Sequence, residues 1–169
     1  QKLASALLQR AVAETVAQNY EGAISDLEAC LDIDSTSVVA LWQRAYCQTM
    51  MPEFDRQTRN AKGDATSASL KSARIVADLD LAIQADKDNQ YLYYNRGCAY
   101  MAERDYTHAI DDFTRAINID RSLAEAYYNR GLARVHNGLK TEGIADLSKA
   151  GELGLYKAYS VIKKISNSK

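Results

Sequence analysis

One short segment occurs twice in this chain, and the distance between its two copies constrains the fold more than any other feature. The segment Tyr93–Gly97 (YYNRG) returns 34 residues later as Tyr127–Gly131, and Ala109–Phe113 has a weaker echo in Gly143–Leu147. Repetition at this period is typical of arrays of helix hairpins, in which each hairpin buries its apolar face by stacking on a neighbour. The sequence therefore predicts an all-α solenoid.

Two charged residues repeat in step with the array, and they divide the chain into units. The arginines are Arg10, Arg44, Arg96 and Arg130, and the aspartates are Asp26, Asp78, Asp112 and Asp146. The arginine steps are 34, 52 and 34 residues and the aspartate steps are 52, 34 and 34, so 18 extra residues fall inside the second unit. The spacing predicts units at about 4–37, 38–89, 90–123 and 124–154, with a loop inserted near 49–69.

The arginine and the aspartate of one unit fall on opposite arms of the predicted hairpin. Arg96 and Asp112 each stand eight residues from Arg104 at the turn, which corresponds to about 12 Å of helix on either arm. We predict that the four arginines pair with the four aspartates, within a unit or across the next seam, through two parallel hydrogen bonds. The alternative is a row of arginines that binds an anionic ligand, and the one-to-one match of opposite charges favours the pairs.

Apolar residues at helical spacing and residues that favour helix ends give the element boundaries. Asp105 is placed to cap the second helix of the third unit. Ser122 and Glu125 have the spacing of a capping box, and Ser35–Ser37 offer similar cap chemistry before the helix that carries Trp42. Helices are predicted near 3–17, 20–33, 38–51, 67–85, 90–103, 106–119, 123–137 and 141–152, with a capping helix at 155–166 that covers the last open face of the stack.

Small and aromatic residues in a fixed order make the chain resemble the tetratricopeptide repeat (TPR) family. The third unit matches best, through Tyr93, Gly97, Tyr100, Tyr106, Ala109, Phe113 and Ala116. The resemblance implies one TPR domain over residues 1–169, a right-handed superhelix whose inner, concave wall is formed by the first helix of each unit. Residues 143–164 also look like the close of longer multi-repeat bacterial TPR proteins, which implies that further repeats precede Gln1.

The family's concave wall usually receives an extended peptide or a partner helix, and in this chain that wall is predicted to be aromatic. Some TPR proteins bind a C-terminal carboxylate with Lys or Arg and Asn side chains of this wall. In this chain only Asn95 and Asn129 match, and the positions of the Lys or Arg residues hold Leu8, Trp42, Tyr94 and Tyr128. Carboxylate capture is therefore not expected. The predicted partner-binding residues are Trp42, Tyr46, Tyr91, Tyr94, Asn95, Met101, Tyr128, Asn129, Leu132 and Val135. Packing between adjacent first helices is the alternative role for each ring.

The rest of the sequence argues against several other classes of function. Cys30, Cys47 and Cys98 lack the paired spacing of a zinc site, and His108 and His136 lie in different units, so no metal or other cofactor is expected. No nucleophile turn or glycine-rich phosphate loop is visible. A formal net charge of −1 disfavours nucleic-acid binding. The sequence contains no run of 18 apolar residues, so membrane insertion is not expected.

The sequence thus predicts a non-catalytic scaffold that binds a protein or peptide in its concave groove. Two alternatives remain open at this stage. The chain is the docking or regulatory arm of a larger enzyme whose catalytic part precedes residue 1, or it is a structural array that self-associates. The compartment also stays open between the cytoplasm and the bacterial periplasm, because free thiols and a start without methionine point in different directions.

Overall fold

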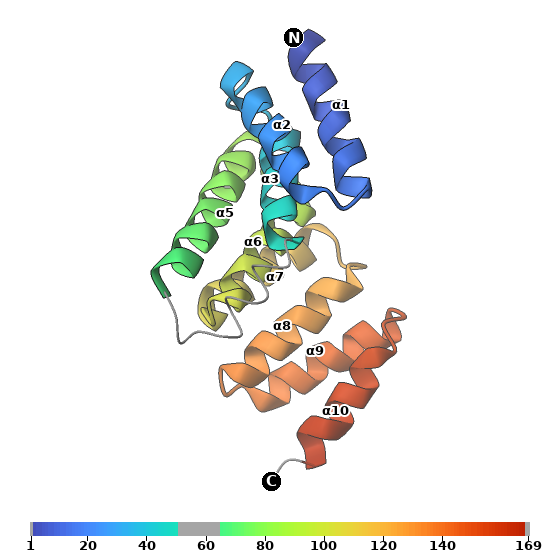
Figure 1. Ribbon diagram of the computed structural model, residues 1–169. Coiled ribbons are helices and arrows are strands. Elements are labelled where there is room, and N and C mark those ends of the chain that lie inside the picture. Colours follow the sequence, from blue (N-terminus) through green and yellow to red (C-terminus); the bar gives the residue numbers. More distant parts are fainter. Residues whose placement is uncertain (1, 51–64, 168–169) are drawn as a thin grey trace. The chain divides into compact units, whose positions relative to one another are not determined.

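Helices make up nearly all of the computed structural model, which describes residues 2–50 and 65–167. The first part of the chain contains α1 (Lys2–Val16), α2 (Tyr20–Ile33), α3 (Val38–Met50) and α5 (Ala65–Ala85). The second part contains α6 (Gln90–Ala102), α7 (Tyr106–Ile119), α8 (Ala124–His136), α9 (Lys140–Glu152) and α10 (Lys157–Asn167). Successive helices pair as hairpins, and α10 packs on α9 (Figure 1). The predicted all-α fold is confirmed, since the described ranges contain no strand.

The chain divides into two compact units, residues 1–87 and 88–169. Unit 1 holds the hairpins α1–α2 and α3–α5, and unit 2 holds α6–α7, α8–α9 and the capping helix α10. The division falls within two residues of the predicted boundary between the second and third repeats. Each unit therefore contains whole hairpins.

Backbone conformation at the tight turns explains where several helices stop. Gln18 and Arg104 have φ of +61° and +60°, and Gly138 and Gly154 have φ of +85° and +101°. One residue in the left-handed region reverses the chain after a helix, and glycine adopts it at least cost. Asp105 then begins α7 as predicted, because its carboxylate accepts a hydrogen bond from the His108 amide at 3.2 Å.

The predicted capping box of α8 is wrong. Leu123 precedes the helix and makes no side-chain cap bond, while the amide and the hydroxyl of Ser122 both donate to Asp120 Oδ1, at 2.8 and 2.6 Å. Thr36 donates in the same way to Asp34 Oδ1, at 3.1 and 2.9 Å. An aspartate that accepts from the residue two positions on forms a local turn of its own, so these hydroxyls donate to the turn and do not accept from the helix.

The loop predicted near 49–69 is shorter than expected at both ends. Residues 49 and 50 complete α3, and residues 65–69 already belong to α5. The middle of the predicted loop lies outside the described residues.

Unit 1 is held together by small and aliphatic side chains from all four of its helices. Ala11, Ala23, Leu27, Ala40, Leu41, Ala45, Cys47, Ile75, Leu79 and Ala82 are at most 2 % exposed. Polar groups tie α1 to α3 across this core, because the Gln43 amide donates to Thr15 Oγ1 at 3.3 Å and Thr15 Oγ1 lies 3.2 Å from Cys47 Sγ. Cys30 and Cys47 are buried free thiols, and Cys98 is a partly buried one.

Glycines let the helices of unit 2 approach each other closely. A Cβ atom on Gly131 would lie 2.8 Å from the Gly143 carbonyl oxygen of α9, and one on Gly143 would lie 2.7 Å from the Gly131 oxygen of α8. In α6, a Cβ atom on Gly97 would meet the Phe113 ring at 2.8 Å. The repeated YYNRG glycine is thus required where two backbones, or a backbone and a ring, touch. Within the described ranges, no helix is both long and apolar enough to cross a membrane.

We expect Gly131→Val to destabilise unit 2 by about 3 kcal/mol, because the added side chain must push α8 away from α9. Urea unfolding followed by circular dichroism measures the change. Ala145→Ser on the exposed face of α9 is the matched control and should leave the midpoint in place. Equal midpoints for wild type and Gly131→Val would show that the helices do not meet here.

Candidate functional site

The arginine and aspartate ladders form the pairs that the sequence predicts, one in each hairpin. In three hairpins, arginine Nε donates to Oδ2 and Nη2 to Oδ1 of the aspartate, at 2.8 and 2.6 Å for Arg44–Asp78, 2.8 and 2.7 Å for Arg96–Asp112, and 2.8 and 2.8 Å for Arg130–Asp146. Arg10 donates to Asp26 with the same two nitrogens. The bidentate pairing is confirmed, and it occurs within a unit every time.

Burial distinguishes these pairs from surface salt bridges. The aspartate side chains are 6 to 9 % exposed. The arginine side chains range more widely, from 11 % exposed at Arg130 to 65 % at Arg10. The two hydrogen bonds from Arg10 hold the pKa of Asp26 below its ordinary value, although burial opposes this.

The last pair also joins neighbouring hairpins. Arg130 Nη1 donates to Thr114 Oγ1 of α7 at 3.0 Å, and Arg134 Nη1 adds a third hydrogen bond to Asp146 at 2.8 Å. Arg130 thus uses three of its five N–H groups within the array. The pairing of all four arginines with aspartates favours a structural role for the ladder.

The predicted partner-binding residues of unit 1, Trp42 and Tyr46, lie together on α3. Their rings stack with centroids 5.9 Å apart and planes 22° apart. Tyr46 is 37 % exposed, whereas Trp42 is partly buried. The Trp42 indole nitrogen is buried without a hydrogen-bond partner among the described residues. Tyr46 thus supplies most of the accessible aromatic surface of this pair.

In unit 2, Tyr94 and Asn129 bind each other across the seam between α6 and α8. Asn129 Nδ2 donates to the Tyr94 hydroxyl oxygen at 3.0 Å and lies 3.6 Å from Cys98 Sγ. The Tyr94 ring packs against Phe113, with centroids 5.8 Å apart. Burial raises the pKa of Cys98 to about 11 and raises that of Tyr94 as well. These side chains hold two hairpins together, which is the packing role left open for the rings of this wall.

The remaining predicted residues of unit 2 differ in how accessible they are. Tyr91 is 50 % exposed. Met101 packs against Ala109, Phe113 and Ala133, while Tyr128 and Leu132 pack against Leu147, Ala150 and Ala158. Asn95 and Val135 are partly buried. Lys157 Nζ lies 4.7 Å from the centre of the Tyr128 ring, which extends this surface onto α10.

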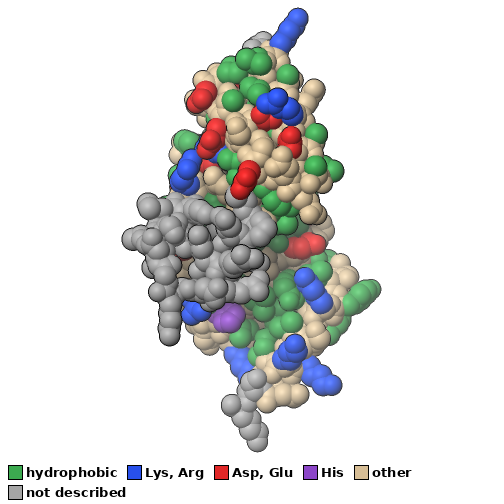
Figure 2. Space-filling view, in the orientation of Figure 1, with side chains coloured by type: hydrophobic (Ala, Val, Ile, Leu, Met, Phe, Trp, Pro, Cys, Tyr) green, Lys and Arg blue, Asp and Glu red, His purple; other side chains and the backbone are tan. Residues whose placement is uncertain are grey.

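Charge and apolar surface are distributed differently on the two units. On the face in Figure 2, unit 1 carries most of the acidic side chains, and unit 2 shows a hydrophobic area with lysines and arginines around it. The acidic residues of α2 include Glu21, Glu28 and Asp32, all exposed. Tyr156 and Tyr159 before and in α10 are 75 and 47 % exposed. Helical spacing places Tyr159 on the apolar face of the predicted capping helix. Nothing in the sequence indicates that Tyr156 stays accessible.

The described side chains give little indication of a metal site or of a histidine that acts as a general base. No three His, Cys, Asp or Glu side chains of residues 2–50 and 65–167 lie close enough together to hold an ion. His108 Nδ1 lies 2.7 Å from Asp105 Oδ2 and the His108 ring stacks on Tyr100, while His136 stacks on Tyr106. Both imidazoles are exposed at the surface.

Comparison with known proteins agrees with this architecture. Residues 91–123 match the tetratricopeptide repeat family. The chain is also similar to the solved structure of MamA, at 22 % identity over 92 % of this chain and 81 % of that one with a TM-score of 0.74. Pseudomonas aeruginosa PilF is 17 % identical over 90 % of this chain and 62 % of that one, with a TM-score of 0.68.

A third structure is the second TPR domain of human RPAP3 in complex with an HSP70 peptide. It is 28 % identical over 70 % of this chain and all of that one, with a TM-score of 0.56. No curated protein matches the sequence significantly. The family match identifies residues 91–123 as a tetratricopeptide repeat, and the structural likeness shows that the helix hairpins of the chain have the fold of TPR solenoids.

The burial of the ion pairs predicts unequal costs for removing the two end aspartates. Asp146→Ala leaves two largely buried guanidinium groups without their carboxylate, which should destabilise unit 2 by about 3 to 5 kcal/mol. Asp26→Ala should cost unit 1 about 1 kcal/mol, because the exposed Arg10 returns to water. Thermal and urea unfolding of both variants test this. Similar costs would contradict the role assigned to burial.

The raised pKa of Cys98 predicts a loss of stability at alkaline pH. Between pH 9 and about 11 the unfolded chain releases the thiol proton, whereas the folded chain keeps it, so the free energy of unfolding falls as pH rises. Cys98→Ala should flatten this slope, as measured by urea unfolding at each pH. Met101→Leu, in the same cluster, changes no titrating group and should keep the wild-type slope. A Cys98→Ala slope equal to that of wild type would exclude this origin.

Proposed function

We propose that the chain is a non-catalytic scaffold that binds a protein or peptide partner along the first helices of its hairpins. The TPR resemblance implies that these helices form a concave wall. The observation that carries the proposal is the exposure of large aromatic side chains on those helices. Tyr46 on α3 and Tyr91 on α6 are 37 and 50 % exposed. Tyrosine is enriched at protein interfaces because it offers apolar area and a polar tip with little conformational freedom to lose.

Neighbouring polar groups support binding to a peptide backbone. Asn95 lies one turn of α6 from Tyr91 and is partly buried, with both amide donors and its carbonyl available in the described structure. A side-chain amide can pair with both an N–H and a C=O of an extended chain. Tyr128 and Leu132 continue the surface along α8. We infer that the wall contacts apolar side chains and main-chain amides of the partner.

The comparisons support the same class of ligand. The second TPR domain of RPAP3, similar over 70 % of this chain, was solved with an HSP70 peptide. The tyrosines and Trp42 in this chain replace basic residues that a terminal carboxylate requires, so we propose a partner segment that is not recognised by its C-terminus.

We expect Tyr46→Ala combined with Tyr91→Ala to abolish partner capture without unfolding the chain, since both rings are substantially exposed. The measurement is pull-down from extracts with tagged full chain, followed by mass spectrometry. Ile119→Ala combined with Leu139→Ala is the matched control, because those side chains are 39 and 41 % exposed on or beside second helices. Capture that survives in the tyrosine variant, or that is lost equally in the control, would remove the first-helix wall as the binding surface.

A further inference from the structure

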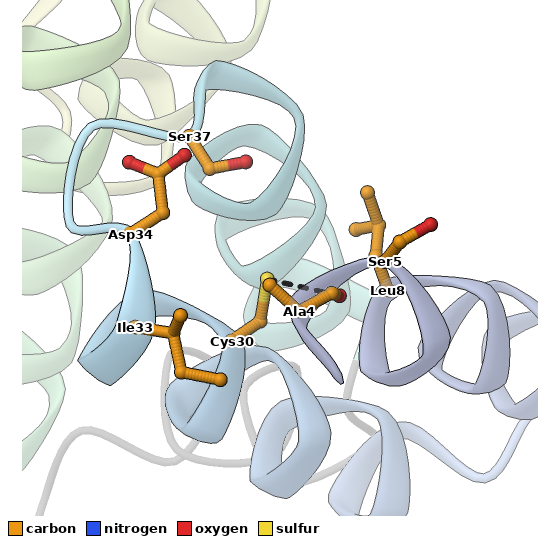
Figure 3. A pocket seen from close by; sticks show the side chains of 7 residues that line it. All are labelled: Ala4, Ser5, Leu8, Cys30, Ile33, Asp34 and Ser37. Atoms are coloured by element: carbon orange, nitrogen blue, oxygen red, sulfur yellow. Dashed lines mark hydrogen bonds between the residues drawn. The ribbon is translucent and has the colours of Figure 1, made fainter. Parts of the chain in front are cut away.

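Unit 1 contains an open pocket that the predicted partner surface does not include. It has a volume of about 500 Å³, which is in the range of sites that hold ligand-sized groups. Figure 3 shows the side chains around it: Ala4, Ser5 and Leu8 from α1, Cys30 and Ile33 from α2, and Asp34 and Ser37 after α2. Cys30 Sγ donates to the Ala4 carbonyl oxygen at 3.5 Å on one side, while Asp34 and Ser37 form a polar rim on another.

The equivalent place in the third hairpin is filled by aromatic rings. Arg10 and Arg96 are 86 residues apart, and so are Asp26 and Asp112, so both arms of the two hairpins correspond residue by residue. Cys30 therefore corresponds to Ala116. Tyr93, Tyr94, Leu123 and Tyr127 pack against the cluster that contains Ala116. Their counterparts are smaller: Leu7 and Leu8 in α1, Ser37 after α2, and Leu41 in α3.

The fourth hairpin repeats the filled arrangement. Ala150 corresponds to Ala116, and Tyr127, Tyr128 and Leu155 pack against its cluster. Two tyrosines thus cover this position in both hairpins of unit 2, and two leucines stand there in the first hairpin. Leu8 and Ser37, the counterparts of Tyr94 and Leu123, line the pocket, so it opens where unit 2 has larger side chains.

The arginine of the first ion pair also lacks the ring that its counterparts contact. Arg96 lies over the Tyr93 ring at 5.8 Å and Arg130 over the Tyr127 ring at 5.5 Å. Among the described residues no ring lies under Arg10, whose side chain is 65 % exposed. A ring held where Tyr93 lies in the third hairpin would contact this guanidinium group, an arrangement favoured by cation–π attraction.

The charges around the pocket indicate the sign of the partner. Asp34 stands at the rim, and only one of its carboxylate oxygens accepts the bonds from Thr36. Asp32, two residues before Asp34 and near the end of α2, is also exposed. Basic residues beside an inserted ring would therefore be attracted.

We propose that this pocket receives a tyrosine side chain from a partner protein, in a segment where Lys or Arg residues flank the tyrosine. The ring lies against Leu8 and Cys30 and beneath Arg10, and its hydroxyl donates to the Asp34 carboxylate. The pocket shares Leu8 with the first-helix wall but contains neither Tyr46 nor Tyr91, so each contact is tested by variants that leave the other intact.

The test uses the ¹⁵N-labelled chain and three capped peptides: Lys-Gly-Tyr-Gly-Lys, the same peptide with Gly for Tyr, and the same peptide with Glu for both Lys. We expect the first peptide to shift the amide signals of Ala4, Ser5, Cys30 and Asp34 in a saturable way. It should bind at least about 10-fold more tightly than either relative, which corresponds to about 1.4 kcal/mol. N-acetyltyrosinamide is a fourth probe, and equal affinity for it would overturn the assignment to a protein segment.

Two filling variants test the location. Leu8→Tyr introduces the ring that Tyr94 has in the third hairpin, and Ser37→Leu introduces the leucine found at position 123. Both positions line the pocket, and both variants should lose the peptide-induced shifts. Val16→Tyr is the matched control, because Val16 is 81 % exposed at the other end of α1, and it should bind as wild type does. Wild-type binding by both filling variants, or shifts confined to other helices, would overturn the proposal.

A second measurement decides the matter should the filling variants not fold. In the wild-type chain, the first peptide should slow alkylation of Cys30 and leave the rates of Cys47 and Cys98 unchanged, because Cys30 alone lines the pocket. Equal rates with and without peptide, or equal slowing at all three thiols, would contradict insertion at this site.

Discussion

A buried carboxylate that must be paired sets the geometry of every hairpin in this protein. In each, an arginine of the first helix meets the aspartate of the second through two parallel hydrogen bonds, and the aspartate is almost inaccessible to water. An unpaired charge at such a position costs several kcal/mol, so only one register of the two helices is tolerated. The planar guanidinium group fixes orientation as well as distance, which lysine would not do.

The same constraint explains why the second hairpin accepts an insertion. Arg44 and Asp78 are 34 residues apart, whereas the other pairs are separated by 16, yet they form the same two bonds. Part of the extra length lies in α5, which has 21 residues where α2 and α7 have 14 each. Lengthening a connection costs little free energy compared with losing a buried ion pair. The paired helices thus keep the repeat geometry while the connection varies.

The hairpins share the ion pair but differ in the side chains that cover their second helices. In unit 2, tyrosines cover the small residues of the second helices, and arginines of the ladder lie over two of those rings. In the first hairpin, leucines stand in their places and a pocket remains. Tyr94 and Asn129, which helical spacing places on the partner-facing wall, are bonded to each other across a seam. Some first-helix rings therefore pack between hairpins, while Tyr46 in unit 1 and Tyr91 in unit 2 stay exposed.

The sequence by itself determined the helix hairpins, the ion pairs and the position of the inserted residues, because a fixed period places equivalent side chains at equivalent points of every repeat. Only the tertiary structure decided which tyrosines are accessible, since that depends on side chains 30 or more residues away, as with Tyr94 and Asn129. It also decided the turn before α8, where Asp120 competes with the helix for the hydroxyl of Ser122. The empty position in the first hairpin became visible in the same way, because a missing ring is recognised only when its neighbours are in place.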